Sequence, residues 1–179
     1  MKIFTVLVFL VSSSVYASNN EDICKSIAEK THEDVPGIIE CLRGIIREKG
    51  DVIQISGTQI EILDKQEDGI YVAVDGKENI TYLFRFVCSD NSCSIFVNNF
   101  LVSSDVSYTY ADADTDGLVE RATRDPDNGM EMDLSIANEA YQSSLEYLKI
   151  RIKTIVFEIN NPNPTMGQLL EELRRVEEE

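Results

Sequence analysis

The spacing of apolar residues changes twice along this chain of 179 residues, and the two changes constrain the fold more than any single motif. Over residues 36–49 the apolar positions recur at helical spacing, and Gly50 follows as a helix stop. Over residues 52–110 apolar and polar residues instead alternate in short runs, which predicts strands. Helical spacing returns after Gly129. This order of helix, strands and helix predicts an α+β fold.

Two helices are expected before the strands and two after them. Residues 19–30 predict a first helix, which would form a helical hairpin with the helix that Pro36 opens. A long helix from about Ser135 to Phe157 is indicated by an apolar stripe, although its β-branched end is also compatible with a last strand. The stripe consists of Ile136, Ala140, Tyr141, Leu145, Leu148, Ile152, Ile155 and Ile159. After a Pro-rich break, Thr165 and Gln168 form a capping-box pattern, which predicts a short final helix. The side chains of this helix that we expect to point inward are Leu169, Leu170, Leu173 and Val176.

The alternating region predicts an antiparallel meander of about five or six strands, because parallel pairing would need longer connections. The apolar runs lie at residues 53–55, 60–62, 70–74, 80–86, 95–97 and 106–110. The predicted fold is therefore an N-terminal helical hairpin and a long C-terminal helix, both packed on this sheet.

Residues 1–17 have the pattern of a secretory signal peptide, with Lys2 before a short apolar run and a small-residue cleavage site at 15–17. The run is too short for a hydrocarbon layer roughly 30 Å thick, so a permanent membrane anchor is the less favoured alternative. We expect a secreted or periplasmic protein, with a single α+β domain over residues 18–160 and a linker with a short helix over residues 161–179.

Four cysteines lie beyond the predicted signal, and an even number in an exported chain favours disulfides. Cys88 and Cys93 flank a stretch that resembles a hairpin loop of four residues, which would bring them within bridging distance. That pairing leaves Cys24 for Cys41, across the helical hairpin. A zinc or redox site fits less well, because there is no C-x-x-C spacing and the only histidine is His32.

The formal charge of −16 limits the classes of partner. Nucleic acids and anionic lipid surfaces are recognised through clusters of Lys and Arg, which this chain lacks. Cations and basic proteins of the envelope or the secreted space are the better candidates, although the charge also serves to keep an exported protein in solution.

One stretch has the composition of a cation site. Asp112, Asp114 and Asp116 alternate along the chain before Gly117, so that three carboxylates can converge on one point at a sharp turn. Val119 follows as an apolar residue that can anchor the turn to a core. The alternative is a solvated acidic loop in which this order has no ligand.

Residues 112–123 resemble the twelve-residue calcium loop of EF-hand and dockerin-type proteins, over this loop only. The resemblance implies Ca2+ as the ion, held by the carboxylates of Asp112, Asp114 and Asp116, the backbone carbonyl of Leu118, and Glu120 directly or through water. The chain departs from the family at the twelfth place, where Thr123 replaces the bidentate Glu. Substitute ligands are expected in the turn that follows, from Asp125 or Asp127, with Asp133 beyond it.

These observations favour calcium binding as a structural staple that ties the loop to the fold. The alternative is a calcium-independent interaction or inhibitor module, which exposed aromatic side chains on the sheet would support. No nucleophile elbow, glycine-rich phosphate loop or positioned catalytic histidine is present in the sequence, so we do not expect an enzyme, and an enzyme with an unidentified site is the third alternative.

Overall fold

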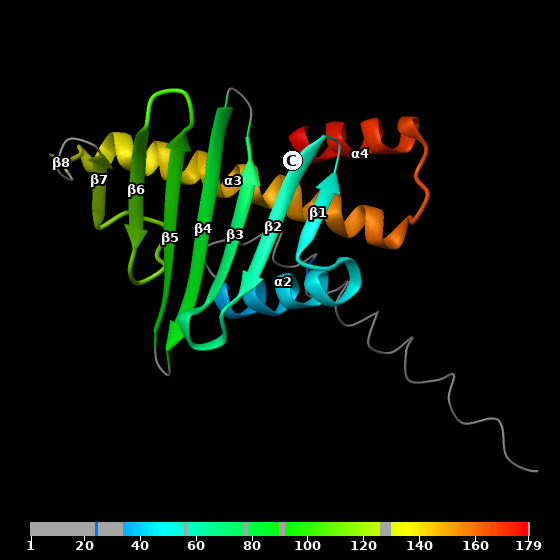
Figure 1. The fold of residues 1–179 in the computed structure, drawn as a ribbon, viewed down its shortest axis with the longest axis horizontal. Coiled ribbons are helices and arrows are strands. Elements are labelled where there is room, and N and C mark those ends of the chain that lie inside the picture. Colours follow the sequence, from blue (N-terminus) through cyan, green and yellow to red (C-terminus); the bar gives the residue numbers. More distant parts are fainter. Residues whose placement is uncertain are drawn as a thin grey trace, which may run out of the picture.

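A computed structural model of the chain describes Cys24 and residues 34–55, 57–76, 79–89, 92–125 and 130–178. The helix α2, Val35–Lys49, precedes an antiparallel sheet of eight strands, and the helices α3, Leu134–Asn160, and α4, Met166–Glu178, follow it (Figure 1). The α+β class is therefore confirmed. The predicted signal peptide and the first predicted helix lie outside the described residues, except for Cys24, so the helical hairpin is not shown.

The sheet is a meander in which each strand pairs with the next one along the chain. Its strands are β1 Val52–Ile55, β2 Thr58–Asp64, β3 Ile70–Asp75, β4 Ile80–Ser89, β5 Ser92–Leu101, β6 Val106–Asp112, β7 Arg121–Asp125 and β8 Met130–Glu131, with a short 3-10 turn at Gln66–Asp68. The predicted runs correspond to β1 to β6. The prediction of about five or six strands was too low, because β7 buries only Ala122 and β8 has only two residues, both exposed, so neither shows an apolar alternation.

Helix α2 begins and ends as its sequence predicts. The Asp34 side chain accepts a hydrogen bond of 3.0 Å from the Gly37 amide at the N-terminus. At the C-terminus Gly50 takes a φ of 87°, which favours glycine. The inner side of α2 buries Ile38, Leu42 and Ile45 almost completely. Capping at both ends thus fixes the length of a helix whose apolar side belongs to the core.

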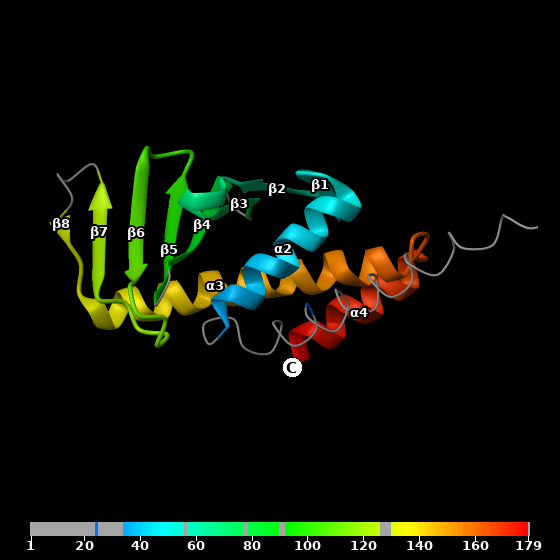
Figure 2. The same cartoon turned by 90° about the horizontal axis from the view of Figure 1, so that it is seen from below.

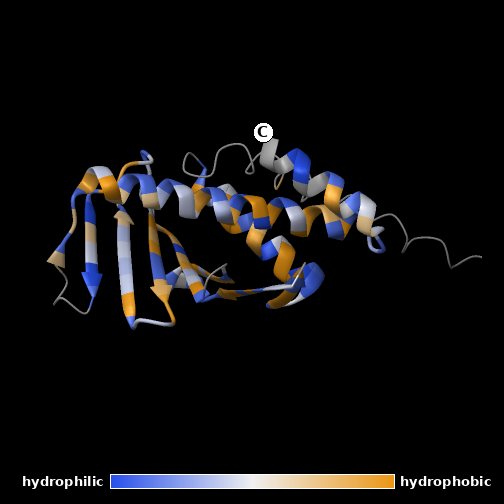
Figure 3. Ribbon diagram, turned by 90° about the horizontal axis from the view of Figure 1, so that it is seen from above, coloured by the Kyte–Doolittle hydropathy of each residue, from blue (hydrophilic) through white to orange (hydrophobic). Residues whose placement is uncertain are grey.

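The helices cover one face of the sheet and leave the other face open (Figures 1 and 2). The core lies between these two layers, and apolar segments of α2 and of the middle of α3 meet there (Figure 3). The central strands contribute alternate residues to this core, for example Val72, Phe84 and Val97, which are paired in register. The arrangement is a two-layer α/β sandwich built on an antiparallel sheet.

Helix α3 runs across the whole sheet. It extends slightly beyond the predicted bounds, and its β-branched end stays helical instead of forming a strand. Asn99 of β5 donates to Ser144 at 2.9 Å, and Tyr147 donates to the carbonyl of Asp75 at 3.1 Å, so α3 contacts the sheet at several points. Ile136 is 61% exposed, so the inclusion of this residue in the apolar stripe was wrong.

Helix α4 opens with the predicted capping box. The Gln168 amide donates to Thr165 Oγ1 at 3.3 Å, and the Thr165 amide donates to Gln168 Oε1 at 2.9 Å. The helix packs along α3 (Figure 2). Leu170, expected to point inward, is instead 59% exposed. The side chains of the other three residues expected to point inward lie outside the described set.

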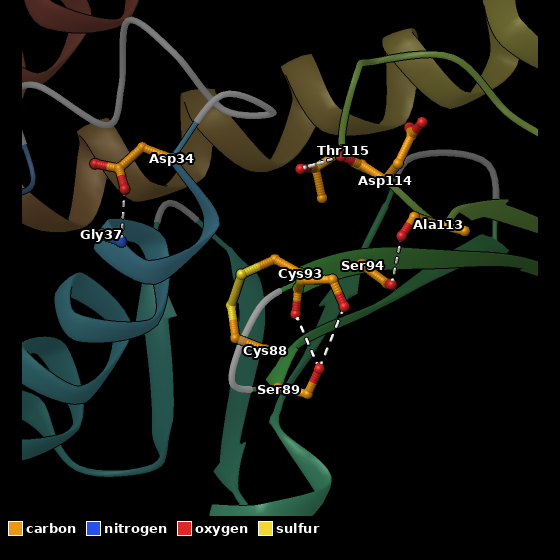
Figure 4. The surroundings of a disulfide bond; sticks show 10 residues. Asp34, Gly37, Cys88, Ser89, Cys93, Ser94, Ala113, Asp114 and Thr115 are labelled. Atoms are coloured by element: carbon orange, nitrogen blue, oxygen red, sulfur yellow. Dashed lines mark hydrogen bonds between the residues drawn. A yellow bond between two sulfur atoms is a disulfide. The ribbon is translucent and has the colours of Figure 1, made fainter.

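Both predicted disulfides are present. Cys88 and Cys93 are directly paired on β4 and β5, with Cα atoms 4.0 Å apart (Figure 4). The hairpin loop is shorter than predicted, because Ser89 and Ser92 continue the ladder and the Ser89 hydroxyl donates to the Ser92 carbonyl at 3.4 Å. The second disulfide joins Cys24 to Cys41 of α2, with Cα atoms 5.2 Å apart. None of the helices in the described part of the chain is long and apolar enough to cross a membrane.

Candidate metal centre

The acidic loop connects two paired strands. Asp112 is the last residue of β6 and Arg121 is the first of β7. The Glu120 amide donates to the Ala111 carbonyl at 3.0 Å, which closes the loop at its base. The described residues on both sides of the loop are therefore strands, in contrast to the helices of an EF-hand.

The loop gathers four carboxylates, those of Asp112, Asp114, Asp116 and Glu120. One oxygen from each lies within 4.8 Å of the corresponding oxygens of the other three. The sequence predicted the three aspartates as direct ligands and left Glu120 as a direct or water-mediated one. The structure places all four together, so the acidic cluster is a possible metal site.

Each of these carboxylates uses one oxygen to hold the loop. Asp114 Oδ1 accepts from the Asp116 amide at 3.3 Å, Asp116 Oδ1 accepts from the Leu118 amide at 2.8 Å, and Glu120 Oε2 accepts from the Ala113 amide at 2.6 Å. Asp112 Oδ2 accepts from the Gly117 amide at 3.2 Å. These hydrogen bonds fix the orientation of the four carboxylates and leave each of them lone pairs to offer a cation.

Asp112 differs from the other three acids because it is completely buried. Its Oδ2 also accepts a hydrogen bond of 2.8 Å from the Tyr141 hydroxyl of α3. Its Oδ1 is buried and accepts no well-formed hydrogen bond from any described residue. A buried carboxylate oxygen without a partner is costly, and a cation held by the acidic cluster would offset that cost.

The electrostatics of the site agree with this geometry. Burial raises the pKa of the Asp112 carboxyl above its ordinary value, and the charge of Glu120 acts in the same direction. Hydrogen bonds from Tyr141 and the amides of Thr115 and Gly117 lower that pKa, but by less. Burial, followed by the hydrogen bond to Asp112, raises the pKa of Tyr141, so its hydroxyl stays protonated and donates. A cation bound beside Asp112 would stabilise the ionised carboxylate and so lower its pKa.

Helix α3 holds the loop through three residues on one of its faces. Asn138 Oδ1 accepts from the Val119 amide at 2.7 Å, and Gln142 Nε2 donates to the Gly117 carbonyl. Tyr141 lies between them along the helix, and the spacing of three and four residues places all three on the same side. Sequence reasoning missed Asn138 and Gln142 and assigned Tyr141 only to the apolar stripe. The signal was available, because two amide side chains flank a tyrosine on an otherwise apolar face.

The backbone of the loop follows the predicted mechanics. Gly117 has a φ of 89°, and Thr115 also lies in the left-handed region with a φ of 61°. Val119 is 3% exposed and anchors the loop to the core, as expected. Ser94 of β5 donates to the Ala113 carbonyl at 2.8 Å, which ties the start of the loop to the sheet (Figure 4). The carbonyl of Leu118 as a further ligand stays a prediction.

Two of the predicted substitute ligands, Asp125 and Asp133, are not part of the gathered group. Thr123 pairs with Thr109 in the β6–β7 ladder, and Asp125 pairs with Ser107 at the end of β7 remote from the loop. Four residues of strand place Asp125 roughly 13 Å from Arg121. Asp127 lies outside the described residues. Asp133 caps α3 by accepting from the Ser135 amide at 2.8 Å.

Comparison of the chain with protein-family models, curated proteins and solved structures found no match. The resemblance to EF-hand and dockerin loops therefore rests on residues 112–120 themselves. Chemically, the loop offers four hard oxygen donors with a combined formal charge of −4 when ionised, which suits a divalent cation.

Proposed function

We propose that this protein binds Ca2+ at the loop between β6 and β7 and that the ion staples this hairpin to α3. The observation that carries the proposal is the buried Oδ1 of Asp112, which accepts no well-formed hydrogen bond from the described residues and belongs to a cluster with three further carboxylates. Ca2+ would supply the missing positive charge, with Asp114, Asp116 and Glu120 as further ligands and the Leu118 carbonyl as a fifth donor.

The donor set supports Ca2+ over Mg2+ and Zn2+. All four gathered side chains are carboxylates on a loop, and Ca2+ accepts several protein oxygens in flexible geometry. Mg2+ requires a tighter octahedral shell and gives up its water reluctantly. Zn2+ favours nitrogen and sulfur donors, and the four cysteines are all in disulfides.

The staple follows from the contacts of the loop. Asp112 accepts a hydrogen bond from Tyr141, and Gly117 and Val119 are hydrogen-bonded to Gln142 and Asn138, so the ion and α3 would act on the same short segment.

In this proposal the protein is exported to an oxidising compartment, which the two disulfides support. Where free calcium is ten times the dissociation constant, mass action would stabilise the folded state by about 1.4 kcal/mol.

Calorimetric titration of the disulfide-bonded protein with Ca2+ and Mg2+ tests the proposal. We expect one Ca2+ site with a dissociation constant of roughly 10⁻⁴ to 10⁻³ M, the range of extracellular calcium modules, and much weaker heat with Mg2+. Asp114→Asn and Asp116→Asn should each weaken Ca2+ binding at least tenfold. Asp125→Asn removes the same charge from the remote end of β7 and serves as the matched control. Equal Ca2+ affinity in all three variants would sink the proposal.

A second candidate is a protein-interaction module, favoured by the open face of the sheet. Tyr71, Arg85 and Phe96 lie side by side in register on that face, and the Arg85 guanidinium lies 5.4 Å and 5.6 Å from the centroids of the two rings. Leu63 and Leu83 nearby are 46% and 45% exposed. Aromatic, Arg and exposed aliphatic side chains are frequent in interface centres. Substitution of Arg85 and Phe96 by Ala would abolish such binding and leave calcium binding unchanged.

A further inference from the structure

One surface triplet has the pattern of an acceptor for N-linked glycans, and it lies at the start of β4 as Asn79-Ile80-Thr81. The pattern requires an asparagine, then any residue except proline, then serine or threonine. One other asparagine of the chain, Asn163, has a threonine two places later, but Pro164 lies between them and excludes it. Asn79 is therefore the single acceptor that the sequence offers.

The backbone of Asn79 is held in place while its side chain is free. The Asn79 carbonyl accepts a hydrogen bond of 3.0 Å from the Val102 amide, which ties the start of β4 to the turn after β5. Asn79 is exposed, and its side chain makes no hydrogen bond with the described part of the chain. Val102 is 56% exposed, and residues 103–105 beyond it are exposed as well. A glycan on the Asn79 amide nitrogen would therefore displace no packed or hydrogen-bonded group.

The turn accounts for the asparagine of this triplet but not for the threonine. Asn79 has a φ of 59°, in the left-handed region that asparagine adopts more readily than most residues. Thr81 pairs with Phe100 in the ladder, and its hydroxyl lies 3.5 Å from Asp75 Oδ1, at the long limit of a hydrogen bond. Valine has the same branched shape and would suit a strand equally well. The hydroxyl that the acceptor pattern requires thus adds little to the fold.

We infer that Asn79 is the attachment site of an N-linked glycan. The inference rests on the export in the proposed function, which the two disulfides support, and not on calcium. The co-substrate is an oligosaccharide joined to a lipid through a diphosphate. The Asn79 amide nitrogen forms a bond to C1 of the first sugar while the bond from C1 to the phosphate oxygen breaks. The lipid diphosphate leaves with the electron pair, and one amide proton passes to a base of the transferring enzyme.

The acceptor and the acidic loop lie at opposite ends of the sheet. Ile80 pairs with Leu101, and Leu101 pairs with Val106, so the starts of β4 and β6 share one end of the sheet (Figure 1). The acidic loop begins at Asp112, at the other end of β6. A strand of seven residues separates the two ends by roughly 20 Å. A glycan at Asn79 would leave the loop accessible, so the glycan site and the calcium site can be tested separately.

Secretion of the full chain from insect cells tests the inference. We expect treatment of the secreted protein with peptide-N-glycosidase to remove one glycan and to give a single shift in mobility. This enzyme converts the acceptor asparagine to aspartate, so the reaction in heavy-oxygen water labels the former site for mass spectrometry of peptides. The label should lie at residue 79 alone.

Two variants at Thr81 separate the acceptor pattern from the turn. Thr81→Ser keeps the hydroxyl and should keep the glycan. Thr81→Val keeps the branched shape and leaves Asn79 in place, but it should lose the glycan while secretion and both disulfides stay intact. A glycan that persists on Thr81→Val would overturn the assignment to Asn79.

The state of the parent protein distinguishes failure of the glycan site from failure of export. A secreted, disulfide-bonded parent protein without a glycan would overturn the glycan site and leave export in place. A parent protein that stays in the cell with its leader attached and its cysteines reduced would overturn export and the glycan site together.

Discussion

The hydroxyl of Tyr141 donates a 2.8 Å hydrogen bond to Oδ2 of Asp112, and this contact joins the long helix to the first acid of the acidic loop between β6 and β7. Both side chains are completely buried. The bond fixes the orientation of the Asp112 carboxylate within the acidic cluster. A change at Tyr141 should therefore act on the loop, although Tyr141 is not a predicted ligand.

Tyr141→Phe is expected to lower both stability and calcium affinity. The substitution keeps the ring but removes a hydrogen bond to a charged group, a loss of roughly 1.5 to 3 kcal/mol. Urea unfolding with and without several millimolar Ca2+ measures the change in the free energy of unfolding. Tyr71→Phe is the matched control, because Tyr71 lies on the open face and its hydroxyl makes no hydrogen bond with the described part of the chain. If both variants behaved alike, Tyr141 would have no special link to the site.

The effect of pH on the calcium-free protein follows from the raised pKa of Asp112. Because the folded-state pKa is higher than the unfolded value, the folded state binds the proton more tightly. This contribution to stability is complete below the unfolded pKa and is lost as pH rises through the folded pKa. Calcium stabilisation should show the opposite trend and fade as pH falls towards about 4, since protons then compete with the ion. Melting temperatures in Ca2+ and in chelator across this pH range test both trends.

Asp112→Asn should separate stability from binding. Near neutral pH the variant no longer buries a charge, so the calcium-free protein should become more stable, by about 1 kcal/mol. The same variant should lose the stabilisation that Ca2+ gives to the parent protein. Thermal melts in chelator and in Ca2+ measure the two effects in one experiment. A less stable calcium-free variant would show that Asp112 serves the fold more than the ion.

The acidic cluster was predictable from sequence because its residues are close together in the chain. Alternating acids before Gly117 place several carboxylates on one turn whatever elements flank it, and the structure gathers Asp112, Asp114 and Asp116 with Glu120. The same locality explains the disulfide pairing of Cys88 with Cys93. Contacts between distant segments were not predictable in this way. Asn138 and Gln142 look like solvent-facing polar residues until the helix is placed beside the loop.

The errors in the predicted fold have a similar origin. Strand β7 has alternating polar and charged residues around Ala122, and it forms because β6 presents an open edge next to it. Its ladder hydrogen bonds are made to the backbone of β6, and an apolar pattern in the sequence does not predict such a pairing. The substitute ligand Asp125 was proposed on the assumption that the chain continues as a loop. Once residues 121–125 form a strand, that carboxylate is moved away from the site.

Removal of the two disulfides should have unequal costs. Cys24 and Cys41 are 17 residues apart, whereas Cys88 and Cys93 are 5 residues apart. The loss of loop-closure entropy in the unfolded chain gives about 3 kcal/mol for the first bridge and about 2 kcal/mol for the second. Paired Cys→Ser variants under denaturant unfolding measure both costs. The reverse order would mean that native packing around β4 and β5, and not chain entropy, sets the contribution of the shorter bridge.

Loss of a helix cap should have different consequences in α2 and α4. Asp34 and Thr165 both accept a hydrogen bond from an amide three residues later, at 3.0 Å and 3.3 Å. Substitution of either by Ala costs its helix about 0.5 to 2 kcal/mol. Because α2 belongs to the core, Asp34→Ala should lower the free energy of global unfolding by that amount. Among the described elements α4 packs mainly on α3, and it exposes Leu170, so Thr165→Ala should increase local opening with little global effect. Amide hydrogen exchange, combined with denaturant unfolding, distinguishes the two cases. If both variants lowered the free energy of global unfolding equally, α4 would unfold together with the core.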